Sequence, residues 1–131
     1  MSRLLLDTSV LISNWHRLSG GQIAGKTGSD ARDWANDVVA FYNTSMVATP
    51  VIIEFSAGTR TGDELSLARA YLERFEAIDH GMILREDWDR ARRIAERIPR
   101  DGKRRQLGDC LIRAIAERFN CDVITLDDRF P

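Results

Sequence analysis

The sequence predicts an α/β fold, a three-layer α/β/α domain with a short, mainly parallel central sheet. Short apolar runs at residues 4–6, 46–49 and 122–125 alternate with longer segments whose apolar residues recur at helical spacing, a pattern typical of strand–helix–strand units. These runs are continuous, as expected for strands that are buried on both faces of a parallel sheet. Because 131 residues is the length of one domain, we expect a single domain over residues 1–131.

The N-terminal elements follow from capping and turn residues. Residues 4–6 predict the first strand, and the polar residues 7–9 provide helix-capping side chains for a helix over 10–15. The stretch 19–30 is rich in glycine and small polar residues and predicts a loop. A second helix then begins, with Ser29 or Asp30 as its N-cap.

The middle of the chain predicts a second strand followed by two helices. The strand covers residues 46–49. Thr49 is the expected N-cap of the next helix and Pro50 its first helical residue, a position that proline favours. This helix ends at Gly58, and another begins at Asp63.

The last part of the chain predicts two strands and two helices. Residues 75–79 predict a third strand, and residues 86–98 an amphipathic helix. A basic loop over 99–105 leads into a helix over 107–119, and residues 122–125 form the last strand.

Composition and charge exclude several classes of protein. A chain with 44% hydrophobic and 30% charged residues is neither disordered nor collagen-like. The net charge of −1, from 19 basic and 20 acidic residues, means that any nucleic-acid site requires a local basic patch. Two cysteines without zinc or redox spacing predict a reducing cytoplasm. No apolar stretch approaches the roughly 18 residues of a membrane span, so we expect no membrane association.

Four acidic residues follow the predicted strands or begin the helices after them: Asp7, Glu54, Asp109 and Asp127. In an open parallel sheet these positions lie along one edge, where such folds bind ligands. Carboxylates about 4 Å apart repel each other by roughly 4 kcal/mol per pair at an effective dielectric constant near 20, so such a cluster requires a cation. Oxygen ligands select Mg²⁺ or Mn²⁺.

Each acid also has a purely structural interpretation. Asp7 and Asp109 could be helix caps or first-turn residues, and Asp127 and Asp128 could belong to a turn. Glu54 is harder to explain in this way, because it stands among apolar residues and solvated glutamates seldom do so.

Four segments carry these acids in order: LLDTSVLI at 5–12, PVIIEF at 50–55, GDCLI with two further alanines at 108–116, and ITLD with a phenylalanine at 124–130. Together they resemble the motifs of PIN-domain ribonucleases, most closely the VapC-type toxins of type II toxin–antitoxin pairs. The resemblance spans almost the whole chain. It implies a metal-dependent endoribonuclease toxin that hydrolyses RNA phosphodiester bonds, is inhibited by a cognate VapB-like antitoxin and forms a homodimer.

The resemblance also implies roles for individual residues. The family's metal-binding, catalytic acids correspond to Asp7, Glu54, Asp109 and Asp127, with Asp128 as an alternative fourth acid, and its hydroxyl positions to Thr8 or Ser9 and to Thr125. The predicted cofactor is Mg²⁺ or Mn²⁺. The sequence differs from the family's pattern in two further places. The loop at 19–30 is longer than usual, and the family commonly adds an edge strand after the position of Pro131.

Further residues are candidates for binding RNA or a partner protein. The loop before Asp109 can contact RNA phosphates, which would position RNA without reading its sequence; its candidates are Arg100, Lys103, Arg104 and Arg105. Apolar helix residues are candidates for the antitoxin or dimer interface: Phe55, Leu65 and Leu67.

Two alternative functions compete with the nuclease. Residues Gly20–Thr27 match the P-loop pattern GxxxxGK[ST], which requires a strand before the loop and a helix directly after it. Here a helix is predicted before the loop, and Ser29 and Asp30 are expected to separate Thr27 from the next helix. The other alternative is a non-catalytic partner-binding module.

Overall fold

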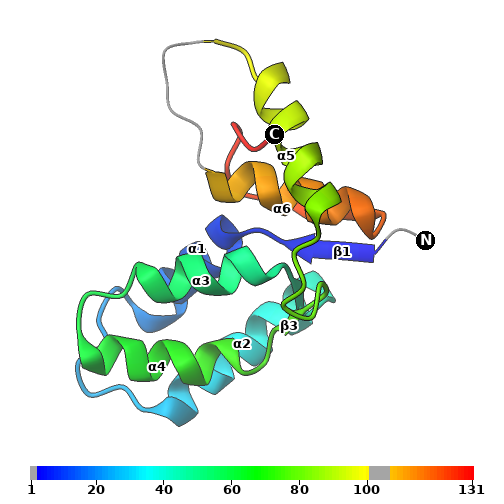
Figure 1. The fold of residues 1–131 in the computed structure, drawn as a ribbon. Helices are drawn as coiled ribbons and strands as arrows, with labels where there is room; N and C mark the ends of the chain where they lie inside the picture. Colours follow the sequence, from blue (N-terminus) through cyan, green and yellow to red (C-terminus); the bar gives the residue numbers. More distant parts are fainter. Residues whose placement is uncertain (1–2, 101–106) are drawn as a thin grey trace.

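Short parallel strands lie at the centre of the structure, a computed structural model that describes residues 3–100 and 107–131 (Figure 1). Strand β1 (Arg3–Leu6) pairs in parallel with β4 (Cys121–Ile124), with Arg3 opposite Cys121 and Leu6 opposite Ile124. Strand β2 (Met46–Val47) pairs in parallel with β3 (Glu76–Ala77). Leu5 and Leu6 are fully buried, as the continuous apolar run predicts.

The described strands form two hydrogen-bonded pairs, where we expected one sheet of about four strands. A threonine side chain links the pairs: the Thr44 hydroxyl donates to the Leu4 carbonyl at 2.8 Å and accepts from the Met46 amide at 3.1 Å. This side chain therefore occupies a position where a ladder hydrogen bond would join β1 to β2.

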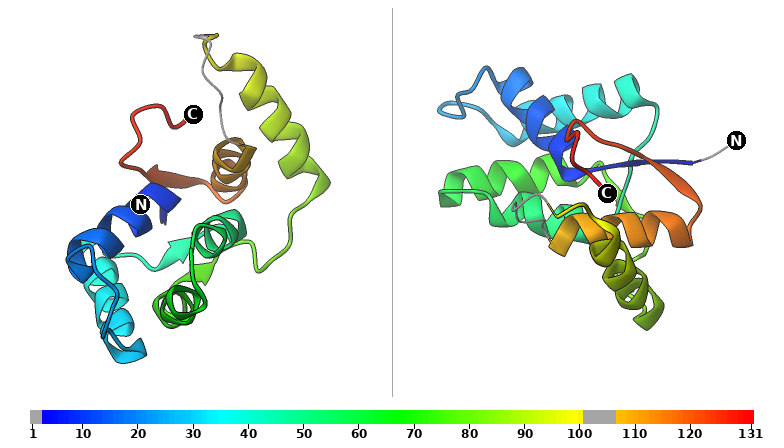
Figure 2. Two further views of the ribbon diagram at one scale, coloured as in Figure 1. Left: turned by 90° about the vertical axis from the view of Figure 1, so that its left-hand side faces the viewer. Right: turned by 90° about the horizontal axis from the view of Figure 1, so that it is seen from above.

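Helices cover both sides of the strands, which gives the predicted three layers (Figure 2). On one side lie α1 (Thr8–Ser19) and α2 (Gly28–Tyr42). On the other side lie four helices: α3 (Thr49–Ala57), α4 (Gly62–Leu72), α5 (Arg85–Arg97) and α6 (Leu107–Arg118). The α/β fold class is thereby confirmed.

Aromatic side chains fix α1 against α2, α3 and α4. The Trp15 ring lies edge-on to Trp34, Phe55 and Tyr71, with centroids 5.0 to 5.3 Å apart. The Tyr71 hydroxyl donates to the Leu11 carbonyl at 2.8 Å, so this buried polar group has a partner, and burial raises the pKa of the Tyr71 phenol. Phe55 and Leu67 are each 7% exposed, so their assignment to a partner interface was wrong.

The helix caps differ from expectation at two positions. Thr27 caps α2: its hydroxyl accepts from the Asp30 amide, and the Asp30 carboxylate accepts from the Thr27 amide. Ala48 takes the N-cap position of α3, and Thr49 is the first helical residue. Its amide donates to the buried Asp79 carboxylate at 2.8 Å, and its hydroxyl also donates to Asp79. A side chain beyond β3 thus replaces the expected local cap.

Within the described ranges, no helix has the length and apolar character needed to cross a membrane.

Candidate active site

Asp7 is the centre of a hydrogen-bond network at the carboxyl end of β1. It is 2% exposed and forms the N-cap of α1. One carboxylate oxygen accepts from the Thr8 amide at 2.7 Å; the other accepts from the Ser9 hydroxyl at 3.0 Å and the Thr125 hydroxyl at 2.8 Å. Every donor is an N–H or O–H group, so both carboxylate oxygens of Asp7 have hydrogen-bond partners. The capping interpretation of Asp7 is therefore confirmed, and its role in a metal site stays a prediction.

Ser9 and Thr125 tie α1 to the chain that leaves β4. The Ser9 hydroxyl accepts from the Leu126 amide at 3.0 Å, and the Thr125 hydroxyl accepts from the Asp127 amide at 3.0 Å. These contacts bring the segment that begins at Thr125 to Asp7, 118 residues earlier. The spatial convergence of the first and last motifs is thus a property of the fold.

Glu54 reaches the same place from α3. Its carboxylate accepts from the Thr8 hydroxyl at 3.1 Å, so Thr8 connects Asp7 through its amide and Glu54 through its side chain. Partial burial raises the pKa of Glu54, and the negative charge of Asp7 raises it further, whereas the Thr8 hydrogen bond lowers it. Two carboxylates of like charge therefore share a partly buried position.

Gly108, next to Asp109 in the first turn of α6, lies directly against Glu54. A Cβ atom at this position would be 2.7 to 2.9 Å from the three atoms of the Glu54 carboxylate, closer than carbon–oxygen packing allows. Only glycine lets the first turn of α6 approach the carboxylate this closely. No separate role was predicted for Gly108; the one signal in the sequence is a glycine directly before an acid at a helix start.

The remaining predicted acids lie within two residues of Gly108 or Thr125, which contact this centre, but among the described residues they form no preassembled cluster with it. Asp109 follows Gly108 in the first turn of α6. Asp127 follows Thr125 by two residues, and its carboxylate accepts from the Arg129 amide at 2.9 Å, a local turn as the structural interpretation expected. Asp128 is exposed. Among residues 3–100 and 107–131, no three His, Cys, Asp or Glu side chains form a group able to hold a metal ion.

The basic loop is described only at its start. Arg100 is exposed after the end of α5. Lys103, Arg104 and Arg105 lie outside the described residues, so their contact with RNA stays a prediction.

The P-loop pattern has the wrong surroundings for a phosphate. Helix α2 does begin directly after Thr27, so the expected separation by Ser29 and Asp30 was wrong. However, α1 precedes the loop where a strand is required, and Gly20 is the C-cap of that helix. The Asp30 carboxylate already accepts from the Thr27 amide and hydroxyl at 2.8 and 3.1 Å. A negative charge therefore occupies the helix start where a phosphate would bind.

A comparison with protein-family models matches residues 4–131 to the PIN domain. The match covers nearly the whole chain and, apart from Arg3 at the start of β1, includes every strand and helix described above. The protein belongs to the PIN-domain family. A search of curated proteins found no match to the chain.

Family membership gives the site its general chemistry. PIN domains are generally nucleases, that is, hydrolases of phosphodiester bonds, and they typically use divalent metal ions. PIN-domain nucleases bind RNA and often have antitoxin partners. The donor set around Asp7 in this PIN domain fits such an ion, because its carboxylate and hydroxyl groups are all oxygen ligands. Burial is the main cause of the raised pKa of Glu54, and a cation would relieve the repulsion from Asp7 that adds to it.

The raised pKa of Glu54 predicts how the metal-free protein responds to pH. Its carboxyl binds a proton more readily in the folded than in the unfolded chain. The free energy of unfolding therefore falls as the pH rises from the ordinary glutamate pKa through the higher pKa of the folded state. In EDTA at neutral pH, Glu54→Gln should therefore raise the melting temperature, because glutamine keeps the acceptor for Thr8 without the charge. At pH 4 the wild type and Glu54→Gln should have the same melting temperature. Melting curves that differ equally at both pH values would contradict this explanation.

Proposed function

We propose that this PIN domain is a divalent-metal-dependent endoribonuclease whose ion is held by Asp7, Glu54, Asp109 and Asp127. The observation that supports it best is the link through Thr8, which joins the buried Asp7 and the partly buried Glu54 from two distant motifs. Gly108 and Thr125 are in contact with these two acids, so the adjacent Asp109 and nearby Asp127 are the natural further ligands. Asp128 remains the alternative to Asp127.

The residues of the chain have separate tasks in hydrolysis. A bound Mg²⁺ or Mn²⁺ supplies positive charge for the scissile phosphate and lowers the pKa of water. Thr8, Ser9 and Thr125 orient the carboxylates, because each donates to one of them. Glu54, whose pKa is already raised, or Asp109 accepts a proton from the attacking water. Water rather than the ribose 2′-hydroxyl attacks, so the products carry a 5′-phosphate and a 3′-hydroxyl.

Cleavage of an end-labelled RNA by the purified chain tests this function. EDTA should stop cleavage, and added Mg²⁺ or Mn²⁺ should restore it, with 5′-phosphate and 3′-hydroxyl ends on the fragments. Cleavage that persists in EDTA and leaves 2′,3′-cyclic phosphate ends would exclude the proposed chemistry.

The biological role that we propose is a VapC-type toxin in the cytoplasm. It would act as a homodimer and be inhibited by a cognate antitoxin, from which an arginine could pair with the site carboxylates. The supporting observation is that Asp7 and Glu54 are two acids of like charge in one place, where the charge of Asp7 adds to the effect of burial in raising the pKa of Glu54. Co-purification with the product of the neighbouring gene tests the partnership, and an active monomer indifferent to that product would contradict it. A full cellular effect from a variant without the acids would favour a non-catalytic partner-binding module.

Lys26→Ala separates the nuclease from the P-loop alternative. Lys26 lies in the loop before α2, away from Asp7 and Glu54, so both RNA cleavage and the melting temperature should stay close to the wild-type values. A titration with ATP or GTP serves as the second readout. Micromolar nucleotide binding that disappears in Lys26→Ala would favour the P-loop function.

A further inference from the structure

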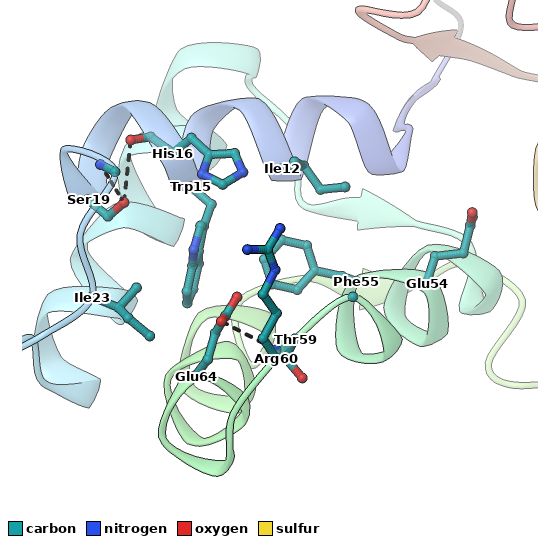
Figure 3. Close-up of a pocket in the computed structure, with 12 residues that line it drawn as sticks. Ile12, Trp15, His16, Ser19, Ile23, Glu54, Phe55, Thr59, Arg60 and Glu64 are labelled. Carbon is teal, nitrogen blue, oxygen red and sulfur yellow. Dashed lines mark hydrogen bonds between the residues drawn. The ribbon is translucent and has the colours of Figure 1, made fainter.

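A pocket extends from Glu54 along the groove between α1 and the α3–α4 turn (Figure 3). Its volume is about 290 Å³, just below the range for small-molecule sites of roughly 300–1,000 Å³. A helix with its side chains is about 10–12 Å wide, so this space suits one planar group rather than a helical peptide. Because Glu54 lines one end of it, whatever occupies the pocket lies next to the candidate active site.

The pocket has apolar walls below a polar rim. Ile12, Trp15 and His16 of α1 recur at helical spacing and face it, and Phe55 lies opposite them. Ile12 is 41% exposed, whereas Trp15 and Phe55 are almost fully buried and hold the floor in place through their edge-on contact. An apolar cleft with the exposed Ile12 on one side and a rigid aromatic floor is suited to the flat face of an unstacked base.

Two oppositely charged side chains line the rim without pairing. Arg60, in the α3–α4 turn, and Glu64, in the first turn of α4, point across the groove toward α1 (Figure 3). The Glu64 carboxylate accepts only a long bond of 3.4 Å from the Arg60 backbone amide. Within the described residues, the Arg60 guanidinium forms no hydrogen bond or ion pair, although Glu64 is only four residues away. The N–H groups of the Arg60 guanidinium and the carboxylate oxygens of Glu64 are thus both available to a ligand.

We infer that this pocket binds a guanine base of the RNA beside the cleaved phosphate, an inference that rests on the proposed nuclease function. Guanine presents adjacent acceptors, N7 and O6, which a guanidinium contacts with two hydrogen bonds. It also presents adjacent donors, N1–H and the 2-amino group, which match the two oxygens of a carboxylate. Adenine, cytosine and uracil lack this combination of paired acceptors and paired donors. Arg60 and Glu64 would then select the base, while the carboxylates around Asp7 act on the phosphate.

Calorimetric titration with the four nucleoside 5′-monophosphates in EDTA tests the pocket without requiring cleavage. The wild-type chain should bind guanosine monophosphate about tenfold more tightly than the other three, the scale of discrimination by a two-bond contact. Arg60→Met and Glu64→Gln should each remove this preference. The matched controls Arg69→Met and Asp63→Asn change the same charges on α4 outside this pocket and should keep it. Equal binding of all four nucleotides, or an unchanged preference in both pocket variants, would overturn the inference.

Sequencing of RNA ends provides the second readout. Wild-type cuts should carry guanosine at one fixed position next to the cleaved bond, and this preference should disappear in Arg60→Met. If the pocket instead accepts a protein segment, Arg60→Met would weaken partner binding and leave both the nucleotide preference and the cut sites unchanged, which also overturns the inference. A guanine preference in the titration together with a wild-type chain that never cleaves RNA would reject only the nuclease function.

Discussion

Asp7→Asn is expected to abolish metal-dependent RNA cleavage, with a loss on the order of a thousandfold, the size seen when one preorganised electrostatic contact is removed. Asparagine has the shape of aspartate but removes a negative charge from the place where Asp7 and Glu54 meet through Thr8. The rate of cleavage of a labelled RNA at saturating Mg²⁺ is the measurement.

The fold should tolerate this substitution. The asparagine side chain keeps an oxygen for the Thr8 amide, and the hydroxyls of Ser9 and Thr125 can each accept a further hydrogen bond from the new amide group. We expect a loss of about 1 kcal/mol in the free energy of unfolding, because charge-assisted bonds become neutral ones. Asp37→Asn is the matched control: it removes an equal charge from an exposed side chain of α2 and should cleave normally. Normal cleavage by Asp7→Asn, or an equal loss in Asp37→Asn, would contradict the assignment.

Gly108→Ala is expected to reduce cleavage by about ten- to a hundredfold, the usual effect of disturbing the support of a metal ligand, without unfolding the protein. The new methyl group would lie 2.7 to 2.9 Å from the Glu54 carboxylate, and that carboxylate must move. Since the displaced group is the end of a flexible side chain, the backbone can stay in place. Alanine is the better helix former by up to about 1 kcal/mol, so the melting temperature should not fall.

Two further variants decide whether Gly108 acts through Glu54. Gly62→Ala places a methyl group at the start of α4, where it meets nothing within 4 Å, and should leave cleavage unchanged. Combining Gly108→Ala with Glu54→Gln should cost no more activity than Glu54→Gln alone, because contacting residues are not additive. Additive losses would show that Gly108 matters for another reason.

The layers of the fold were predictable from local signals because short buried strands and amphipathic helices have distinct periodicities. Leu5 and Leu6 in β1, and Ala91 and Ile94 in α5, are buried as their patterns predicted. What local signals could not predict are the long-range replacements of local bonds. Thr44 takes the place of a strand ladder, and Asp79 replaces the expected Thr49 cap from 30 residues away. Both depend on tertiary contacts.

For the candidate site, the location was predictable from the sequence, but several side-chain contacts were not. Strand ends and helix starts lie at one sheet edge in parallel folds, and the structure brings Asp7, Thr8, Ser9, Glu54 and Thr125 together there. The roles of Asp109 and Asp127 stay predictions, because side-chain directions in the first turn of a helix and in a terminal turn depend on their neighbours. The close approach of Gly108 to Glu54 was not predictable either, since it depends on how α3 and α6 pack.

Direct measurement of Mn²⁺ binding tests the central claim that these carboxylates form an ion site. Mn²⁺ is titrated calorimetrically into the wild-type chain and into a variant that carries both Asp7→Asn and Glu54→Gln, with circular dichroism to establish that both are folded. We expect saturable binding to the wild type and none to the double variant. A wild-type chain that binds no Mn²⁺, or a double variant that binds it equally well, would contradict the account.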